Sequence, residues 1–495
     1  MENFDVVIIG SGLGGLECGV MLSKEGYKVC VLEKHHIAGG CLQSFKRKGI
    51  SLDTGIHYVG SLSDGQVFNQ YLKYFGVLDK LRIKKMDENA FDVIYFEDRQ
   101  YNYSMGIENF ENSLLEKFPN EKDGLNKYCK SLQDIYSSIS VENLKNGLLS
   151  SGSLNTFSLS AYETIANTVK DRTLQNVLVG TLGLYAGDKH TTNFYNHAMI
   201  HYSNIDGAYR FVNSTQQWAD ILVEQIRSNG GEVLTRKEVT SIEVKDNIVE
   251  SIMLKTGEKI FAKYVISSIH PANTFDLVEK NPLIKKAYLT RLHSLQNSCG
   301  MFTVYLIYKK ENFPYINQNH YIYTTNDIWD NFKQTCNGKV ASVLVVMQAT
   351  ENSDYNVVTL LFPVSLAQLG PWINTVSGNR GSSYEEFKEE KKNEAIAIAK
   401  QYLPKLSENI EFYYTASPLT YRDYTGTPDG SAYGIVKDYH SPFTTLMPVK
   451  TRLANLLLTG QNVNVHGALG VTLTAAHTCA ELLGKEFLAK KIWSA

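Results

Sequence analysis

The sequence predicts an α/β fold that opens with a Rossmann-type nucleotide-binding unit. Three observations in the first 33 residues predict it: a β-branched run of strand length at 4–9, glycines in GxGxxG spacing directly after it, and Glu33 roughly 20 residues further on. A GxGxxG motif alone is a weak indicator. Its position between a predicted strand and a predicted helix, with the acidic residue downstream, makes the interpretation specific.

The first elements follow one another in the order that such a unit needs. The apolar run 4–9 predicts the first strand, and the segment 16–26 has the pattern of a helix that ends at Gly26. The segment 27–33 predicts the second strand. A helix placed after the glycine turn points the free N–H groups of its N-terminus at a phosphate.

The glycines and the acidic residue indicate which ligand the unit holds. Gly10 permits a tight turn, Gly12 lets the backbone approach a pyrophosphate, and Gly15 lets helix and strand pack closely. Glu33 can accept hydrogen bonds from a ribose diol and disfavours a 2′-phosphate, so FAD or NAD fits better than NADP. The glycine pair at 39–40 permits a second close backbone approach, with a plain turn as the alternative.

Later segments add further elements to the pattern. The segment 215–231 has helical apolar spacing and ends at glycine, and 232–268 predicts successive short strands separated by turns. The segment 455–484 predicts a strand, a glycine loop and a helix from about Gly470, whose first N–H groups are free for a flavin's phosphate or pyrimidine edge. The charged run at 384–403 predicts an exposed amphipathic helix with a solvated charged face.

Composition narrows the function classes. The chain has 495 residues, enough for two to three domains, and 43% hydrophobic with 20% charged residues is ordinary for a globular protein. A net charge of -2 gives no sign of a nucleic-acid partner.

The seven cysteines show no metal-binding spacing, which favours reduced thiols in a cytoplasmic protein and no metal site. No run approaches the ~18–20 apolar residues of a membrane span, and peripheral membrane contact stays open.

Strings along most of the chain resemble one superfamily. VVIIGSGLGGL, VLEKHHIAGGC and LDTGIHYVG are similar to the phytoene desaturase-like FAD flavoproteins, and the resemblance continues in patches at 196–209, 230–244, 264–275, 417–434 and 456–484. Within that superfamily, the glycine pair followed by Cys41 and the string DTGIHY resemble the retinol saturase (all-trans-retinol 13,14-reductase) and carotenoid isomerase branch.

The resemblance implies the overall architecture. It implies a Rossmann-type FAD-binding domain of the p-hydroxybenzoate hydroxylase or amine oxidase type, interleaved with a mixed α+β substrate domain. The FAD-binding domain would be discontinuous and cover 1–75, 205–280 and 445–495. The substrate-binding domain would cover 76–204 and 281–444.

The resemblance also assigns FAD to particular residues. The glycine motif and Glu33 would hold the ADP half, the segment 39–42 would meet the phosphates and ribityl chain, Val239 would meet adenine, and 460–471 would close over the flavin. The residues assigned to FAD are Gly10, Gly12, Leu13, Gly14, Gly15, Glu33, Lys34, Gly39, Gly40, Cys41, Leu42, Val239, Gly460, Asn462, Gly470 and Val471.

Two positions depart from the pattern of the superfamily. Asn462 stands where these proteins usually have an aspartate, so a charged contact near the flavin becomes neutral. RFVNS follows Tyr209 where YPxGG is frequent, in a loop that often lies against flavin and substrate. The second departure bears on substrate identity more than on FAD binding.

The chemistry would belong to the flavin. The sequence shows no nucleophile elbow, no HExxH motif and no second dinucleotide fingerprint, so a dedicated NAD(P)H domain is not expected. Hydride transfer at flavin N5, to or from a carbon of a hydrophobic conjugated substrate held in a dry cavity, is the expected reaction. Saturation, desaturation and isomerisation, and the redox donor or acceptor, stay open here.

Reduction of a double bond also needs a proton donor beside the flavin. His57 and Tyr58, in the segment SLDTGIHYVG, and His466, in the C-terminal glycine loop, are the candidates by predicted position. Each has a structural alternative, in which the side chain only hydrogen-bonds the cofactor's polar edge. Asp53 is best explained as a partner of backbone amides, and His197 as a packed helix histidine.

Two other functions share the fold. A flavin amine oxidase or protoporphyrinogen oxidase is one, but amine oxidases commonly place a lysine and an aromatic pair near N5, and no such group is identified. A prenyl-binding protein of the Rab GDP-dissociation inhibitor type is the other, and the complete GxGxxG motif and Glu33 argue against it. The leading prediction is an FAD-dependent oxidoreductase, of the polyene reductase, desaturase or isomerase type, acting on a retinoid- or carotenoid-like small molecule.

Overall fold

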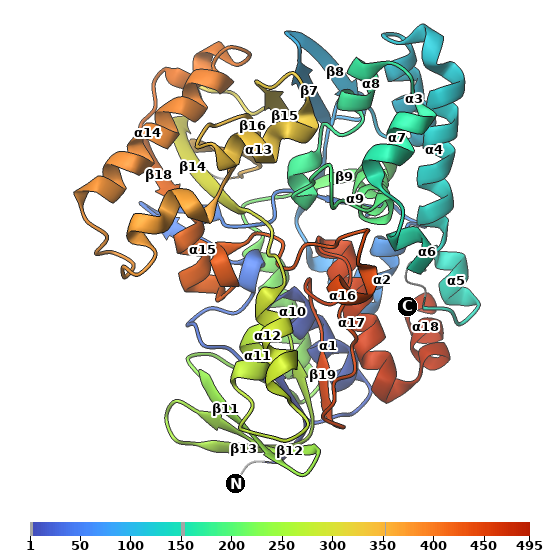
Figure 1. The fold of residues 1–495 in the computed structure, drawn as a ribbon, viewed down its shortest axis with the longest axis vertical. Helices are drawn as coiled ribbons and strands as arrows, with labels where there is room; N and C mark the ends of the chain where they lie inside the picture. Colours follow the sequence, from blue (N-terminus) through green and yellow to red (C-terminus); the bar gives the residue numbers. More distant parts are fainter. Residues whose placement is uncertain (1–2, 150–153, 352) are drawn as a thin grey trace.

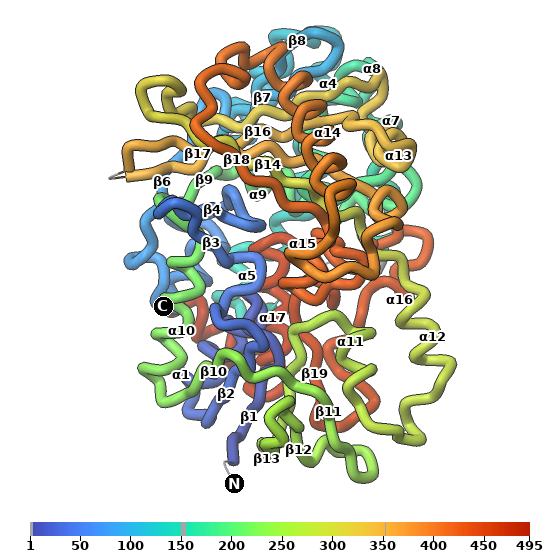
Figure 2. The backbone as a smooth tube through the Cα atoms, turned by 90° about the vertical axis from the view of Figure 1, so that its left-hand side faces the viewer, coloured from blue at the N-terminus to red at the C-terminus, as the bar shows by residue number. Residues whose placement is uncertain are grey.

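A computed structural model describes residues 3–149, 154–351 and 353–495 and contains two large sheets at opposite ends of its long axis (Figures 1 and 2). The first sheet has a parallel core, β10-β2-β1-β13-β19, which continues antiparallel from β13 into β12 and β11. Its strands are β1 (Asn3–Ile9), β2 (Val29–Leu32), β10 (Glu232–Leu234), β11 (Val239–Lys245), β12 (Ile248–Leu254), β13 (Lys259–Ser267) and β19 (Leu456–Leu458).

Three helices cover one face of this sheet: α1 (Leu13–Lys24), α10 (Gln216–Ser228) and α17 (Ala468–Leu483). Because α1 packs between α10 and α17, all its residues from Leu13 to Ser23 are buried. Gly15 belongs to the junction of β1 and α1, where a Cβ would lie 2.2 Å from the carbonyl oxygen of Gly10. These elements confirm the predicted Rossmann-type unit.

The second sheet has the order β18-β14-β17-β16-β15-β7-β8 and is antiparallel except for the parallel pair β15 and β7. Its strands are β7 (Asp92–Phe96), β8 (Arg99–Tyr103), β14 (Gly300–Lys309), β15 (Asn319–Tyr323), β16 (Ser342–Gln348), β17 (Tyr355–Val364) and β18 (Phe412–Ala416). Every residue of β7 and β15 is buried, and so is nearly every residue of β14 and β17, because helices cover both faces of the sheet.

One face of the second sheet packs against helices from 107–206, which share a core with β7, β8 and β15. These helices are α3 (Ile107–Leu115), α4 (Lys122–Ser137), α7 (Ala161–Thr168), α8 (Arg172–Val177) and α9 (Phe194–Asp206). His197 lies fully buried in α9, and its two ring nitrogens hydrogen-bond the hydroxyls of Tyr128 and Tyr185, each at 2.8 Å. It is the packed helix histidine that the sequence predicts.

The other face of the second sheet carries α14 (Ser382–Ala399). The helix is present as predicted, but its charged face is not wholly solvated. Lys391 is 5% exposed and donates to the carbonyl oxygen of Gly338 at 2.9 Å, and Lys392 is 7% exposed with its ammonium 3.7 Å from the ring centre of Tyr413. The expectation was wrong here because long lysine stems can cover apolar surface while the ammonium finds a polar partner.

A small sheet joins the two halves of the molecule, in the order β5-β9-β6. Its strands are β5 (Val59–Gly60), β6 (Ile83–Lys85) and β9 (Ala208–Phe211), and the hairpin of β3 (Ser44–Arg47) and β4 (Ile50–Asp53) precedes them. Gly60 packs against α9 so closely that a Cβ would lie 2.1 Å from the carbonyl oxygen of Ser203. The segment 51–60 thereby spans the space between the two large sheets. The predicted domain boundaries stay a prediction.

The described residues contain no helix that is long and apolar enough to cross a membrane. They also contain no group of three or more His, Cys, Asp or Glu side chains that could hold a metal ion. All seven cysteines lie in the described part of the chain, and none of them forms a disulfide.

A buried acid in α1 gives a stability prediction. Glu17 is fully buried, and the loss of solvation raises the pKa of its carboxyl well above the ordinary value of 4.5. A raised folded-state pKa means that the native protein binds the extra proton, so the stabilisation present at low pH is lost as the pH rises. Glu17→Gln, which is neutral and nearly isosteric, is expected to raise the free energy of unfolding by roughly 1–3 kcal/mol near pH 7.

Urea unfolding of the wild type and the Gln variant at about pH 5 and about pH 8 measures this difference. The gain should be larger at the higher pH. Thr472 Oγ1 donates to Glu17 Oε1 at 2.7 Å, and the Gln side chain retains that acceptor. A variant that is no more stable than the wild type at either pH would contradict a neutral Glu17.

Candidate functional site

A cavity of about 500 Å³ lies between the two large sheets and is lined from both. The glycine turn after β1, the end of β2 and the start of β11 form one part of its wall, which we call the nucleotide end. Parts of β15, β16 and β17, with residues of α9 and of the segment 431–433, form the opposite part, which we call the inner chamber. The segments 54–60 and 460–471 line the cavity between these two ends.

At the nucleotide end, the wall is made mainly of backbone. Gly10 has φ +92°, a conformation that favours glycine, and Gly12 precedes the first turn of α1. Glu33 accepts hydrogen bonds from Ser11, through both the backbone N–H and the hydroxyl, and from the N–H of His35 at 2.9 Å. The carboxylate therefore fixes the turn while it lines the cavity.

The space beside Gly12 fits a dinucleotide. A Cβ built on Gly12 meets no atom within 4 Å, so a side chain there would occupy the cavity itself. The glycine pair packs onto this turn: a Cβ on Gly40 would lie 2.9 Å from the Cα of Gly12, and the N–H of Gly39 donates to the carbonyl oxygen of Ser11 at 3.0 Å. A polar cradle of backbone, next to the N-terminus of a helix, suits a pyrophosphate.

The structure brings almost all residues assigned to FAD onto this one wall. Of the sixteen, only Gly15 does not line the cavity, because it lies at the packed junction of α1 and β1. The residues that line it are Gly10, Gly12, Leu13, Gly14, Glu33, Lys34, Gly39, Gly40, Cys41, Leu42, Val239, Gly460, Asn462, Gly470 and Val471. Their individual contacts with FAD stay a prediction.

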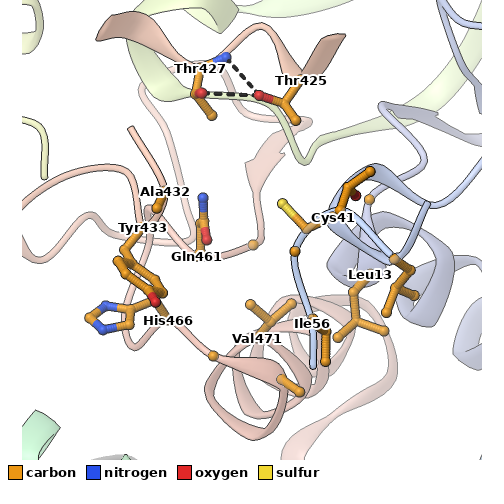
Figure 3. A pocket seen from close by; sticks show the side chains of 18 of the residues that line it. Leu13, Cys41, Ile56, Thr425, Thr427, Ala432, Tyr433, Gln461, His466 and Val471 are labelled. Atoms are coloured by element: carbon orange, nitrogen blue, oxygen red, sulfur yellow. Dashed lines mark hydrogen bonds between the residues drawn. The ribbon is translucent and has the colours of Figure 1, made fainter. Parts of the chain in front are cut away.

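Between the two ends the wall is largely apolar. Leu13, Ile56 and Val471 lie on one side of the space drawn in Figure 3, and Tyr433 and His466 lie across it. The ring centres of that tyrosine and histidine are 5.0 Å apart. An apolar wall with few polar groups is typical of sites for hydrophobic ligands.

The segment 51–60 is held in place by polar contacts at its start. The carboxylate of Asp53 accepts hydrogen bonds from the backbone N–H of Thr215 at 3.0 Å and from its hydroxyl at 3.1 Å. Burial raises the pKa of Asp53 to about 6. Gly55 packs onto Cys41, where a Cβ would lie 2.9 Å from the carbonyl oxygen. Asp53 is thus a partner of a backbone amide, as the sequence predicts.

The three predicted proton-donor candidates all line the cavity, but they differ in their hydrogen-bond partners. Burial lowers the pKa of His57 to about 4, with a smaller effect of Arg210, and lowers the pKa of His466 to about 3, with a smaller effect of Lys437. Both imidazoles are therefore neutral near pH 7. Nε2 of His57 and both ring nitrogens of His466 have no hydrogen-bond partner among the described residues, so they are available to a ligand.

Tyr58 has the strongest connection to other polar groups. Its hydroxyl donates to Asp92 Oδ2 at 2.9 Å and lies 2.7 Å from the hydroxyl of Tyr321. Tyr321 also lines the cavity, whereas Asp92 lies behind the wall. Burial raises the pKa of Tyr58 well above its ordinary value, so its hydroxyl keeps its proton.

Sequence reasoning missed the residues behind this wall. Asn319 donates to Asp92 Oδ1 at 2.7 Å, and Arg210 donates to Asn319 Oδ1 at 2.8 Å. Arg210 is the first residue of the RFVNS string that departs from the superfamily, and this departure was the available signal. Nothing in the sequence indicated Asp92 or Tyr321, because β7 and β15 are far apart in the chain and meet only in the sheet.

The departure at Asn462 also has a structural explanation. Asn462 Oδ1 accepts a hydrogen bond from the N–H of Ile435 at 3.1 Å, so the neutral side chain serves the neighbouring loop. Lys437 is buried behind it and donates to the carbonyl oxygens of Asn462 at 2.6 Å and Thr445 at 3.0 Å. Burial lowers the pKa of Lys437 to about 7, and the residue does not line the cavity.

Comparisons with known proteins support a flavoprotein. The chain is 27% identical to an all-trans-retinol 13,14-reductase of Danio rerio over 97% of this chain and 86% of the relative. It is 24% identical to a prolycopene isomerase 2 of an Oncidium hybrid cultivar over 88% of this chain and 75% of the relative. The fold is similar to that of cyclohexylamine oxidase from Brevibacterium oxydans, with a TM-score of 0.61 at 14% identity over 97% of this chain and 100% of the other.

The match to a sequence family is longer than half of the chain. The family described as flavin containing amine oxidoreductase matches residues 13–357, which include α1, the segment 51–60 and most of the second sheet. The Rossmann-type unit and the dinucleotide-sized cavity agree with that family's cofactor. The chain therefore belongs to the flavin-containing amine oxidoreductase family and is an FAD-dependent oxidoreductase.

Proposed function

We propose that the protein saturates a C=C bond of a hydrophobic conjugated substrate, a retinoid- or carotenoid-like polyene. The observation that carries the proposal is the continuous cavity, which joins a dinucleotide cradle to an apolar inner chamber. The printed activities of the relatives support a polyene as the substrate class. The reductase match covers 97% of the chain, against 88% for the isomerase, which favours saturation.

In this proposal the residues of the nucleotide end hold FAD. The glycine turn and the N-terminus of α1 hold the pyrophosphate, Glu33 accepts from the ribose, and Val239 lies at the adenine. The loop 460–471 and the segment 40–42 enclose the flavin. Bound flavin, when reduced, supplies a hydride. The protein has to orient the polyene, exclude water and supply a proton.

The inner chamber suits a polyene better than an amine. Its lining includes Met199, Ile200, Leu344 and Leu361, which offer no charge. Among the described lining residues, the acidic side chains are Glu33 and Glu238, both at the nucleotide end. An ammonium group in the chamber would lack a carboxylate partner, and burying an unpaired charge is costly. This observation favours the polyene over an amine substrate.

A direct test uses the visible spectrum of the purified protein. We expect a bound oxidised flavin, and after anaerobic reduction we expect reoxidation by all-trans-retinol or a carotenoid, with the saturated product found by mass spectrometry. Cyclohexylamine, mixed with the oxidised protein, should not reduce the flavin. Reduction by the amine, or the absence of any reaction with polyenes, would refute the proposed substrate class.

A further inference from the structure

Three side chains form a hydrogen-bonded chain that ends at the wall of the inner chamber. Asp92, the first residue of β7, bonds Tyr58 at 2.9 Å, and Tyr58 bonds Tyr321 of β15 at 2.7 Å. Their exposed fractions are 0%, 8% and 2%, so water competes little for these bonds. Both tyrosines line the cavity and Asp92 does not. The strands β7 and β15 lie side by side (Figure 1), and their parallel pairing sets Asp92 opposite Asn319.

The number of protons shared by these three side chains decides whether Tyr321 offers a hydrogen-bond donor or only an acceptor to the cavity. With a neutral Asp92, the three groups hold three O–H protons, and two of these are used in the two bonds between them. The donation from Tyr58 to Asp92 described above belongs to the ionised acid. In the neutral state the carboxyl donates to Tyr58, Tyr58 donates to Tyr321, and the O–H of Tyr321 is left over. With an ionised Asp92 only two protons remain, and both are used in the two bonds between the three groups. The hydroxyl of Tyr321 can then only accept a hydrogen bond from a ligand in the cavity. The acid thus controls whether Tyr321 presents a proton.

Burial favours the neutral form of Asp92, and the polar groups around it limit that preference. Asn319 occupies Oδ1 of Asp92, which leaves Oδ2 for Tyr58. Burial raises the pKa of Asp92 to about 7, although the hydrogen bonds and the charge of Arg210 act in the opposite direction. The titratable and charged groups that face the acid are Tyr58 beside β5, Tyr103 on β8, Arg210 on β9, and Tyr321 and Tyr323 on β15.

The other candidates lack such a connection. His57 and His466 are neutral near pH 7, and no acidic side chain hydrogen-bonds either ring among the described residues. Burial also raises the pKa of Tyr321 well above its ordinary value, so the difference from the neutral imidazoles lies in the connection to an acid. Tyr321, by contrast, would be re-protonated within the chain as it gives up its proton.

We propose that Tyr321 is the catalytic proton donor of the saturation, and that Tyr58 and Asp92 are positioning residues that direct and replace its proton. This inference rests on the proposed function. One alkene carbon receives the hydride from reduced FAD, and the π pair forms a C–H bond on the other carbon with the proton of Tyr321. Tyr58 passes its proton to Tyr321, Asp92 passes its proton to Tyr58, and Asp92 is left as a carboxylate. The substrate gains two electrons, and the flavin loses two.

The variant that tests the proton path most directly is Asp92→Asn. An amide can donate to Tyr58 and accept from Asn319, so the donor directions and the packing are retained, but it has no acidic proton to pass on. We expect a normal flavin content and reoxidation by the polyene about 10- to 100-fold slower than in the wild type. The wild-type rate should fall as the pH rises through about 7, and the variant should lose this dependence.

Tyr321→Phe removes only the last hydroxyl and should also slow reoxidation and abolish the pH dependence. Tyr95→Phe is the matched control. Tyr95 is a buried tyrosine on β7, the strand of Asp92, and it does not line the cavity. Its hydroxyl bonds His320 at 3.2 Å. Infrared spectra offer a readout without turnover: the wild type minus Asp92→Asn difference should contain a protonated carboxyl band that disappears as the pH rises through about 7.

The outcomes separate the two proposals. Reoxidation of the wild type by a polyene, with unchanged rates and pH profiles in Asp92→Asn and Tyr321→Phe, would overturn the proton path alone. The absence of a carboxyl band in the difference spectrum would overturn it as well. A wild type that no polyene reoxidises would overturn both proposals. Slower reoxidation with a flat pH profile in both variants, and a normal Tyr95→Phe, would support the path.

Discussion

Gly12→Val is expected to lower the affinity for FAD by at least about 1,000-fold, about 4 kcal/mol, and to yield a colourless protein. The reason is steric. A Cβ on Gly12 points into open space of the cavity, so a valine side chain would take the place of the pyrophosphate at the N-terminus of α1. The loss should appear in the flavin-to-protein ratio and in titration of the apoprotein with FAD.

The fold should survive this change, which makes the result interpretable. Gly12 has φ -63° and ψ 170°, an extended conformation that valine adopts readily. Gly370→Val is the matched control, because a Cβ there also meets no atom within 4 Å, and the residue lies outside the cavity wall. Stoichiometric flavin in Gly12→Val would refute the placement of FAD. Loss of flavin in both variants would point to general instability.

The cofactor end could be predicted from the sequence because its determinants are local. The turn after β1, the start of α1 and the acid at the end of β2 follow one another within 33 residues, and each needs a residue type that no other can replace. Gly10 requires a positive φ, Gly12 requires open space, and Gly15 touches a carbonyl oxygen. Helix and strand boundaries shifted by a few residues, as at Leu13, where α1 begins three positions before the predicted start.

The inner chamber could not be predicted in the same way. The hydrogen-bonded groups at and behind its wall come from the segment 51–60, β7, β9 and β15, and the two bonded residues Tyr58 and Tyr321 are 263 positions apart along the chain. Asp92 has no local motif around it, and its function depends on Tyr58 and Asn319, which reach it only through sheet pairing. In the sequence it is one aspartate at the start of an apolar strand. Side-chain chemistry of this kind needs the tertiary structure.

The protonation states of the buried groups could not be predicted from the sequence either. His57 is one of the candidate proton donors by its position beside the expected flavin, yet burial lowers its pKa to about 4 and leaves the ring neutral. The same loss of solvation acts in the opposite direction on Asp92, whose pKa rises to about 7. Burial thus shifts the expected acid from the histidine to the carboxyl. Neither degree of burial can be read from the motif.

Gly183→Phe is expected to slow reoxidation of the reduced flavin by a polyene at least about 100-fold, with a normal flavin content. Gly183 lies in the short helix η4 (Leu182–Tyr185) and lines the cavity, a Cβ on it meets no atom within 4 Å, and its carbonyl oxygen accepts a hydrogen bond from Tyr433 at 3.0 Å. A phenyl ring there would fill space needed by a long conjugated chain, and Gly183 is not among the residues assigned to FAD.

A small electron acceptor separates this block from damage to the flavin. Benzoquinone should reoxidise Gly183→Phe as fast as the wild type, because it needs only the space next to the flavin. Gly183→Ala is the matched control, since a methyl group fits the open space, and it should react with the polyene at nearly the wild-type rate. An unchanged polyene rate in the Phe variant would show that the substrate does not enter the inner chamber. An equal loss with polyene and benzoquinone would mean that the flavin site itself is altered.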